Sequence, residues 1–197
     1  MPGKPYYEAC HLVVDIETLG VKIPAPILSI GVAMLDCSNG IPATLSVRNI
    51  QVDPARCIGA PETASVLWWM NSKMDSARAA ALEPESDDDP FAAFLKLIDD
   101  FKPDYFWGKS PDFDFGHLEA QLAHQGLPIP WKFWQLRDIR TIEGLGCPMT
   151  DDEIFTNPPA KWVNHDIVHT ADYDAWVEAR SLYAVVIHLS QSFRSGT

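Results

Sequence analysis

The chain has 197 residues, 47% of them hydrophobic, which is enough to bury one core, and we expect a single domain over residues 1–197 with its core at about residues 11–193. The formal net charge of −12 argues against tight, non-specific binding to duplex nucleic acid, because phosphate backbones attract Lys and Arg. The four cysteines show no C-x-x-C spacing and no apolar run approaches the length of a membrane span, so we expect no zinc site and no disulfide framework, in a soluble cytoplasmic protein.

The first third of the chain predicts three strands. Residues 11–16 form a short apolar run rich in valine, which is typical of a buried strand. Residues 27–35 are apolar and rich in β-forming side chains, and residues 44–52 alternate polar and apolar side chains. Together these segments predict a three-stranded antiparallel meander.

Two carboxylates lie on or directly after the first predicted strand. Asp15 and Glu17 are two residues apart, so their side chains project from the same face of a strand. A solvent-facing pair at a strand end is the simpler alternative, but this strand is apolar on both faces, where an unpaired carboxylate is costly. Carboxylate oxygens are hard ligands that suit Mg²⁺ or Mn²⁺, so the pair predicts a metal site.

The rest of the chain predicts helices that alternate with strands. The predicted helices cover residues 64–74, 91–101, 113–124 and 171–193, and the predicted strands cover residues 104–108 and part of 134–141. Residues 83–90 are acidic, contain proline and predict a loop. Strands followed by alternating helices and strands indicate an α/β domain with a mixed sheet.

Three motifs, in this order, resemble the DnaQ-like 3′–5′ exonucleases that carry an Asp-Glu-Asp-Asp core and a histidine (DEDDh). They are D-x-E-T at residues 15–18, Phe113-Asp114 followed by Leu118, and H-x-A-x-x-D-A at residues 169–175. The stretches WGKSPDFD and WKFWQLRDIRT are similar to those of phage exonuclease A and the related bacterial 3′–5′ exoribonucleases. The resemblance covers roughly residues 11–190 and implies the ribonuclease-H-like fold and an intracellular protein of phage or bacterial type.

The resemblance also implies a chemistry. Four carboxylates would hold two Mg²⁺ or Mn²⁺ ions, and His169 would accept a proton from the attacking water; the carboxylates are Asp15, Glu17, Asp114 and Asp174. The implied reaction releases nucleoside monophosphates from single-stranded nucleic acid, with DNA slightly favoured. An exoribonuclease that acts on RNA, and a non-catalytic nucleic-acid-binding module on a nuclease fold, are the alternatives, and a homodimer is left open.

Seven residues are candidates for substrate contact: Ile16, Thr18, Leu19, Lys109, Asp112, Arg137 and Arg140. By the resemblance, Ile16, Thr18 and Leu19 pack against the terminal nucleotide. Lys109 stands where the relatives usually carry Asn. Asp112 is assigned either to capping of the helix that carries Asp114 or to substrate contact.

Several residues compete for the same roles. His169 has three rivals, His117, His165 and His188, but only His169 lies five residues before an aspartate that alanine follows. Asp166 and Asp172 are rivals of Asp174. We expect Asp172 to face solvent, because it lies about half a helical turn from Asp174.

The aromatic residues allow two interpretations. Base stacking and core packing both use large aromatic side chains, and the candidates here are Trp107, Trp131, Phe133, Trp134 and Trp162. Lys161 is a further candidate for phosphate contact. We expect Trp107, on a predicted strand, to belong to the core, and both interpretations stay open for Trp131 and Trp134.

Overall fold

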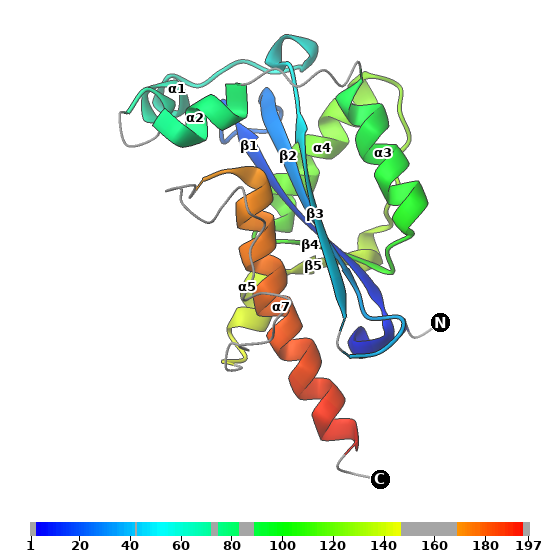
Figure 1. Ribbon diagram of the computed structural model, residues 1–197. Coiled ribbons are helices and arrows are strands. Elements are labelled where there is room, and N and C mark those ends of the chain that lie inside the picture. Colours follow the sequence, from blue (N-terminus) through cyan, green and yellow to red (C-terminus); the bar gives the residue numbers. More distant parts are fainter. Residues whose placement is uncertain (1–2, 42, 72–74, 83–88, 147–168, 195–197) are drawn as a thin grey trace.

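A computed structural model describes residues 3–41, 43–71, 75–82, 89–146 and 169–194. Five strands form one mixed sheet in the order β3-β2-β1-β4-β5 (Figure 1). Their bounds are β1 (Cys10–Thr18), β2 (Ile27–Asp36), β3 (Thr44–Gln51), β4 (Tyr105–Gly108) and β5 (Leu136–Asp138). β1, β2 and β3 pair antiparallel, and β4 and β5 continue the sheet parallel to β1. The predicted meander and the predicted α/β class with a mixed sheet are confirmed.

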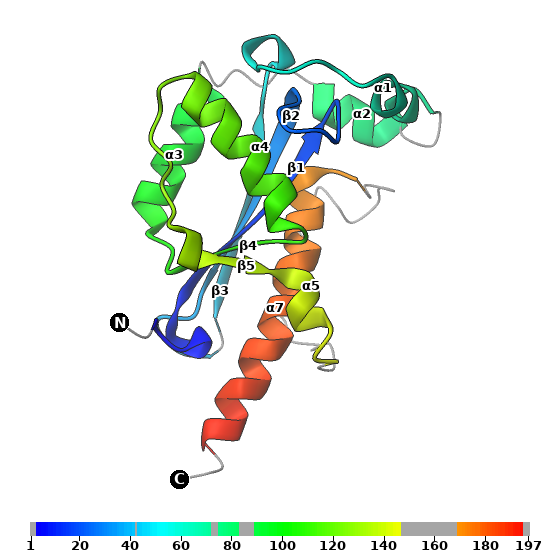
Figure 2. The same ribbon diagram turned by 180° about the vertical axis from the view of Figure 1, so that it is seen from behind.

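Helices cover both faces of the sheet. α3 (Pro90–Phe101) and α4 (Pro111–His124) pack on one face, and α5 (Ile139–Glu143) and the long α7 (Ala171–Arg194) pack on the other (Figures 1 and 2). This three-layer arrangement is that of the ribonuclease-H-like fold. Successive side chains of β1 point to opposite faces of the sheet, so both faces are apolar and need a covering layer. Leu12 and Val14 face α3 and α4, whereas Val13 faces α7.

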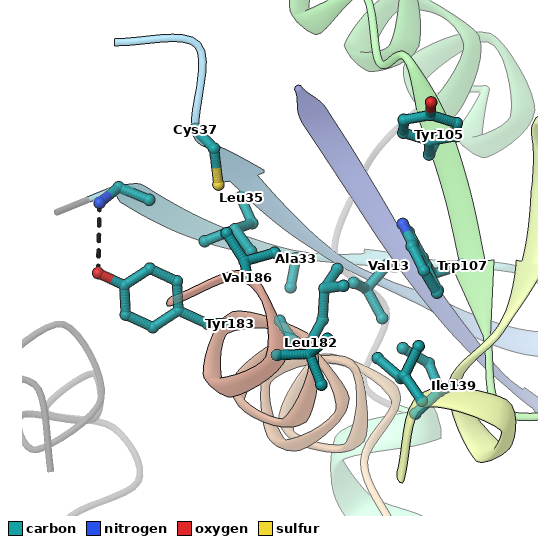
Figure 3. Close-up of a cluster of buried hydrophobic side chains, with 14 of the residues drawn as sticks. Val13, Ala33, Leu35, Cys37, Tyr105, Trp107, Ile139, Leu182, Tyr183 and Val186 are labelled. Carbon is teal, nitrogen blue, oxygen red and sulfur yellow. Dashed lines mark hydrogen bonds between the residues drawn. The ribbon is translucent and has the colours of Figure 1, made fainter. Parts of the chain in front are cut away.

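The α7 layer is anchored by a buried cluster around Trp107, which is 1% exposed (Figure 3). Leu182 and Val186 of α7 pack against Val13, and the Tyr183 hydroxyl accepts a hydrogen bond from the backbone N–H of Ala43 at 3.4 Å. The prediction that Trp107 belongs to the core is confirmed. The cluster fixes α7 against β1, which matters below because both elements carry carboxylates.

The segment between the meander and α3 differs from the prediction. The helix predicted over residues 64–74 is α1 (Thr63–Trp69), and a further helix, α2 (Asp75–Leu82), was not predicted. Trp69 and two α2 alanines form a small cluster with Leu28, and Figure 1 shows both helices beyond the end of β1. The sequence could not indicate α2, because its alanine-rich apolar face is short and only tertiary contact gives it a core to pack on.

The start of α4 also differs. The helix begins at Pro111 after Ser110, and Asp112 is an exposed residue of the first turn rather than its cap. Proline at the first helical position favours this earlier start, since its missing N–H needs no partner there. The capping role assigned to Asp112 is therefore wrong.

Two further expectations concern the described part of the chain. Its cysteines, Cys10, Cys37 and Cys57, are free thiols. Within the described residues, no helix combines the length and apolar character that a membrane crossing needs.

Candidate active site

Three carboxylates from two elements meet at the end of β1. Asp15 and Glu17 point to the α7 face of the strand, and Asp174 comes from the first turn of α7. Each offers an oxygen such that the three lie within 4.8 Å of one another, and all three residues are half-buried. The sequence prediction that these residues come together agrees with this geometry.

Gly31 of β2 allows this approach. It is the register partner of Asp15 in the β1–β2 ladder. A Cβ atom at this position would lie 2.0 Å from the backbone carbonyl of Ala171, which is the first residue of α7. The helix that carries Asp174 can therefore sit directly on the strand beside Asp15 only because residue 31 has no side chain.

Asp114 reaches the same place from the first turn of α4. It is 4% exposed, and backbone hydrogen bonds from Ile16 and Ser110 hold its carboxylate. Gly108 at the end of β4 leaves room for it, because a Cβ atom there would lie 2.9 Å from Asp114 Oδ2. A helix that starts directly after a buried parallel strand thus places this carboxylate at the carboxyl edge of the sheet.

Burial and mutual repulsion disfavour the charged forms of these groups. The pKa of Asp15 is raised well above its ordinary value, first by burial and then by the charges of Asp114 and Glu17. Burial and then the charge of Asp174 likewise raise the pKa of Glu17. Burial also raises the pKa of Asp174, and it raises that of Asp114 to about 7 against its backbone hydrogen bonds. Such a cluster ionises fully only with positive charge beside it.

The donor set fits a divalent cation. Three carboxylate oxygens within 4.8 Å provide hard ligands, and their raised pKa values mean that a bound cation would relieve repulsion. The acidic cluster is therefore compatible with divalent metal binding.

His169 lies at the edge of this cluster. It is exposed, its φ is 68°, and its backbone hydrogen bonds to Asp174. Its ring packs edge-on against Trp68 of α1, with 5.3 Å between ring centroids. His165, a rival of His169, and Asp166, a rival of Asp174, lie outside the described residues.

Most of the candidate site residues line one cavity of about 450 Å³. Asp15, Asp114, Asp174 and His169 form part of its wall, together with residues from β4 and the helices. Two cations also face it. Lys109 Nζ pairs with Glu143 Oε1 at 3.0 Å, and the Arg140 guanidinium hydrogen bonds to the Ser110 hydroxyl.

An apolar cavity of about 370 Å³ adjoins the first, since Ile16 and Phe113 line both. Glu17, Thr18 and Trp68 complete much of its wall. Trp68 was not predicted as a site residue, and its signal in the sequence was weak, because ASVLWWM reads as an ordinary helix. Its side chain is 42% exposed, whereas the neighbouring Trp69 is buried.

Three of the candidate substrate residues lie away from both cavity walls. Leu19 packs against the cluster of Trp69 and α2, and Asp112 is exposed. Arg137 lies over the Tyr105 ring, 4.8 Å from its centroid, and donates hydrogen bonds to the Tyr6 hydroxyl and the Trp134 carbonyl. The structure thus gives Arg137 a packing role, and its contact with substrate stays a prediction.

Trp131 and Trp134, for which both core packing and base stacking were possible, differ in their exposure. Trp131 is 3% exposed and donates its indole N–H to Glu119, so it belongs to the core. Trp134 is 60% exposed and lies beside Phe133, which is 83% exposed. Trp162 and Lys161 lie outside the described residues.

Two acidic residues in the first turns of α7 differ from what the sequence indicated. Asp172 was predicted to face solvent but is 4% exposed, because the start of α7 lies directly on β2 at Gly31. Glu178 was not predicted as a site residue, yet it is 4% exposed and lines the acidic cavity. Burial raises the pKa of its carboxyl group to about 9. Its position four residues after Asp174 was the available signal, since such residues share one helix face.

Comparisons with known proteins identify the family and the fold. Residues 10–186 match a family described as the 3′–5′ exoribonuclease Rv2179c-like domain. A comparison with curated protein sequences found no match. Among solved structures, the chain resembles the crystal structure of cell-death related nuclease 4 (CRN-4), with 12% sequence identity and a TM-score of 0.58. That match covers 92% of this chain and 64% of the nuclease chain, and it shows a shared fold.

Proposed function

The chain belongs to the 3′–5′ exoribonuclease Rv2179c-like domain family, within the DnaQ-like 3′–5′ exonuclease superfamily, and on that premise we propose that it releases nucleoside monophosphates from the 3′ end of single-stranded RNA. The observation that carries the proposal is the meeting of Asp15, Glu17 and Asp174 within 4.8 Å, beside His169. A module that only bound nucleic acid would have no use for buried, mutually repelling carboxylates.

Two divalent cations, Mg²⁺ or Mn²⁺, would be held by Asp15, Glu17, Asp174 and Asp114, and when bound they would acidify the attacking water and stabilise the leaving 3′ oxygen. His169 accepts the proton of the attacking water, a role that its exposed position at the cavity edge permits. The backbone hydrogen bond from His169 to Asp174 holds the two residues in register during this step.

The adjoining apolar cavity would hold the terminal nucleotide. Its walls of Ile16, Phe113 and Trp68 offer apolar and aromatic surface for one base, next to Glu17. Lys109 and Arg140 face the acidic cavity and would contact phosphates of the strand. A paired end would have to unstack and unpair before it could occupy the cavity, at a cost of the order of a few kcal/mol.

The choice of RNA over DNA rests on the description of the family. It reverses the slight preference for DNA that the motifs alone suggested. The 2′-hydroxyl group is what distinguishes RNA from DNA at a given site, so matched RNA and DNA substrates test the preference directly.

The test is a gel assay on matched single strands of RNA and DNA, labelled at the 5′ or the 3′ end, with Mg²⁺ or Mn²⁺. We expect a ladder that shortens from the 3′ end, mononucleotide products, faster loss of RNA than of DNA, and no reaction in EDTA. Cleavage of a circular single strand would contradict the proposal. Faster loss of DNA would contradict only the substrate preference. A sizing experiment in the same buffer would test the expected single domain and the homodimer.

A further inference from the structure

A buried carboxylate that the proposed reaction does not use lies in the wall of the acidic cavity. Glu178 is 4% exposed, and its Oε2 atom has no hydrogen-bond partner. A buried, unpartnered carboxylate oxygen is destabilising, and native structures retain few of them. The side chain therefore needs an explanation, and its place in the cavity wall provides one.

The carboxylates of the site are distributed over the walls of two adjoining cavities. Asp15, Asp114, Asp174 and Glu178 line the acidic cavity, whereas Glu17 lines the adjoining apolar cavity. The charge of Glu178 acts on Asp15, and the charge of Asp114 is the largest that acts on Glu178. Glu178 therefore shares the acidic cavity with Asp15 and Asp114, whereas Glu17 does not line it.

Under the proposed function the cation beside Asp15 and Asp114 is the more weakly held of the two. Asp15, Glu17 and Asp174 form the tight group, with oxygens within 4.8 Å. Among the described residues, no equally tight group contains Glu178 or Asp114. A cation there would keep several of its waters, as Mg²⁺ usually does, and carboxylates a little farther away can hold those waters.

On the proposed function, we propose that Glu178 is a fifth carboxylate of the metal centre and holds the second cation through water, on the side of Asp15 and Asp114. Its position supports this role, since it lies one helical turn after Asp174 on the same face of α7. Lys109 is the competing partner for its charge, but the Lys109 ammonium group pairs with Glu143 at 3.0 Å.

The experiment is a titration of the whole protein with Mn²⁺ in the absence of nucleic acid, followed by the electron paramagnetic resonance signal of free Mn²⁺. We expect the wild-type protein to bind two ions. Glu178→Gln keeps the volume of the side chain and removes its charge, so it should bind the first ion normally and the second at least tenfold more weakly. Glu178→Asp keeps the charge on a shorter side chain and should fall in between.

Glu8→Gln is the matched control, because it makes the same chemical change at an exposed residue that lines neither cavity. Its Mn²⁺ titration should match that of the wild type. Thermal melting gives a second readout: Glu178→Gln should raise Tm in EDTA, where the buried carboxylate is unfavourable, and should gain less than the wild type from Mn²⁺.

The outcomes separate this inference from the proposed function. Two ions bound with equal affinity by wild type and Glu178→Gln, or one ion bound by both, would overturn the role of Glu178 and leave the nuclease proposal standing. A wild-type protein that binds no Mn²⁺ would overturn both.

Discussion

Asp15 lies where the negative charges of the other site carboxylates all raise its pKa. Four charges raise its pKa besides burial, and its side chain belongs to the tight group with Glu17 and Asp174. We predict that Asp15→Asn removes nearly all nuclease activity in either Mg²⁺ or Mn²⁺. The fold should stay intact, and Tm in EDTA should be unchanged or slightly higher, because carboxylate repulsion falls. Circular dichroism melts and the gel assay measure both effects, and wild-type turnover by the variant in Mn²⁺ would rule out the site.

His169 tests the proton-transfer role. We predict that His169→Ala lowers kcat by roughly 10²–10⁴, the usual scale of general-base catalysis, with little change in Mn²⁺ affinity. His188→Ala is the control, since His188 is an exposed residue much farther along α7. If the two variants behaved alike in single-turnover assays, another group would have to accept the proton.

How far individual residues could be predicted depends on their local motif. Asp15, Glu17 and Asp174 were found because strand alternation and motif spacing fix where they point, and the structure brings them together. Glu178 was missed although its position four residues after Asp174 places it on the same helix face. The burial of Asp172 was missed because it follows from how closely α7 approaches β2. No pattern within α7 itself records that distance.

At the scale of elements, the close packing of α7 on β2 brings Asp174 to the carboxylates of β1. We predict that Gly31→Ala destabilises the fold by about 1–3 kcal/mol, as overpacking usually does, because its Cβ atom would lie 2.0 Å from the Ala171 carbonyl. The backbone of α7 must shift, so the variant should also lose most activity and most of its stabilisation by Mn²⁺.

Gly144→Ala is the control for this change, since a Cβ atom there would meet its nearest neighbours at 3.4 Å, an ordinary contact. Urea unfolding and Mn²⁺-dependent Tm shifts measure the two variants side by side. A Gly31→Ala protein with wild-type Mn²⁺ stabilisation would show that α7 does not need this close approach.

The second element that positions the site is α1, whose Trp68 borders the apolar cavity and touches His169. We predict that Trp68→Ala raises KM about tenfold, because stacking on one base contributes roughly 1–3 kcal/mol. It should also lower kcat, because the His169 ring loses its neighbour. Leu67→Ala, on the same helix and outside the cavity wall, should change neither constant.

A substrate that lacks the 3′-terminal base separates these two effects. With it, the KM difference between wild type and Trp68→Ala should vanish while the kcat difference remains. A kcat difference that also vanished would show that Trp68 acts on the base alone.

The elements themselves were predictable to different degrees. The meander, α3 and β4 were predicted within two residues at each end, because period-two alternation, an Asp-Pro start and a short apolar run are local signals. The start of α4 lies two residues before its predicted position, because a proline outweighs a nearby aspartate, and α2 was not predicted, since it depends on a tertiary cluster.

At the scale of the whole molecule, the net charge of −12 and the buried carboxylates make stability depend on pH in a defined direction. Carboxyl groups of an unfolded chain lose their protons near pH 4. In the folded, metal-free protein, burial holds the pKa of Asp114 at about 7 and that of Glu178 at about 9. Between these limits the folded state binds more protons than the unfolded state, so the free energy of unfolding falls as pH rises.

We therefore predict that Tm in EDTA falls steadily from pH 5 to pH 9, by about 2–4 °C for each kcal/mol lost in a chain of this size. Glu178→Gln should flatten the upper part of the curve, because it removes the group whose pKa is about 9. Saturating Mn²⁺ should weaken or reverse the slope, since cations bind the ionised carboxylates and compete with protons for them. Scanning calorimetry across this range, with and without Mn²⁺, measures the slopes. A metal-free Tm that rose with pH would mean that the folded protein binds fewer protons than the unfolded chain, so burial and repulsion would not be raising the pKa values of the cluster.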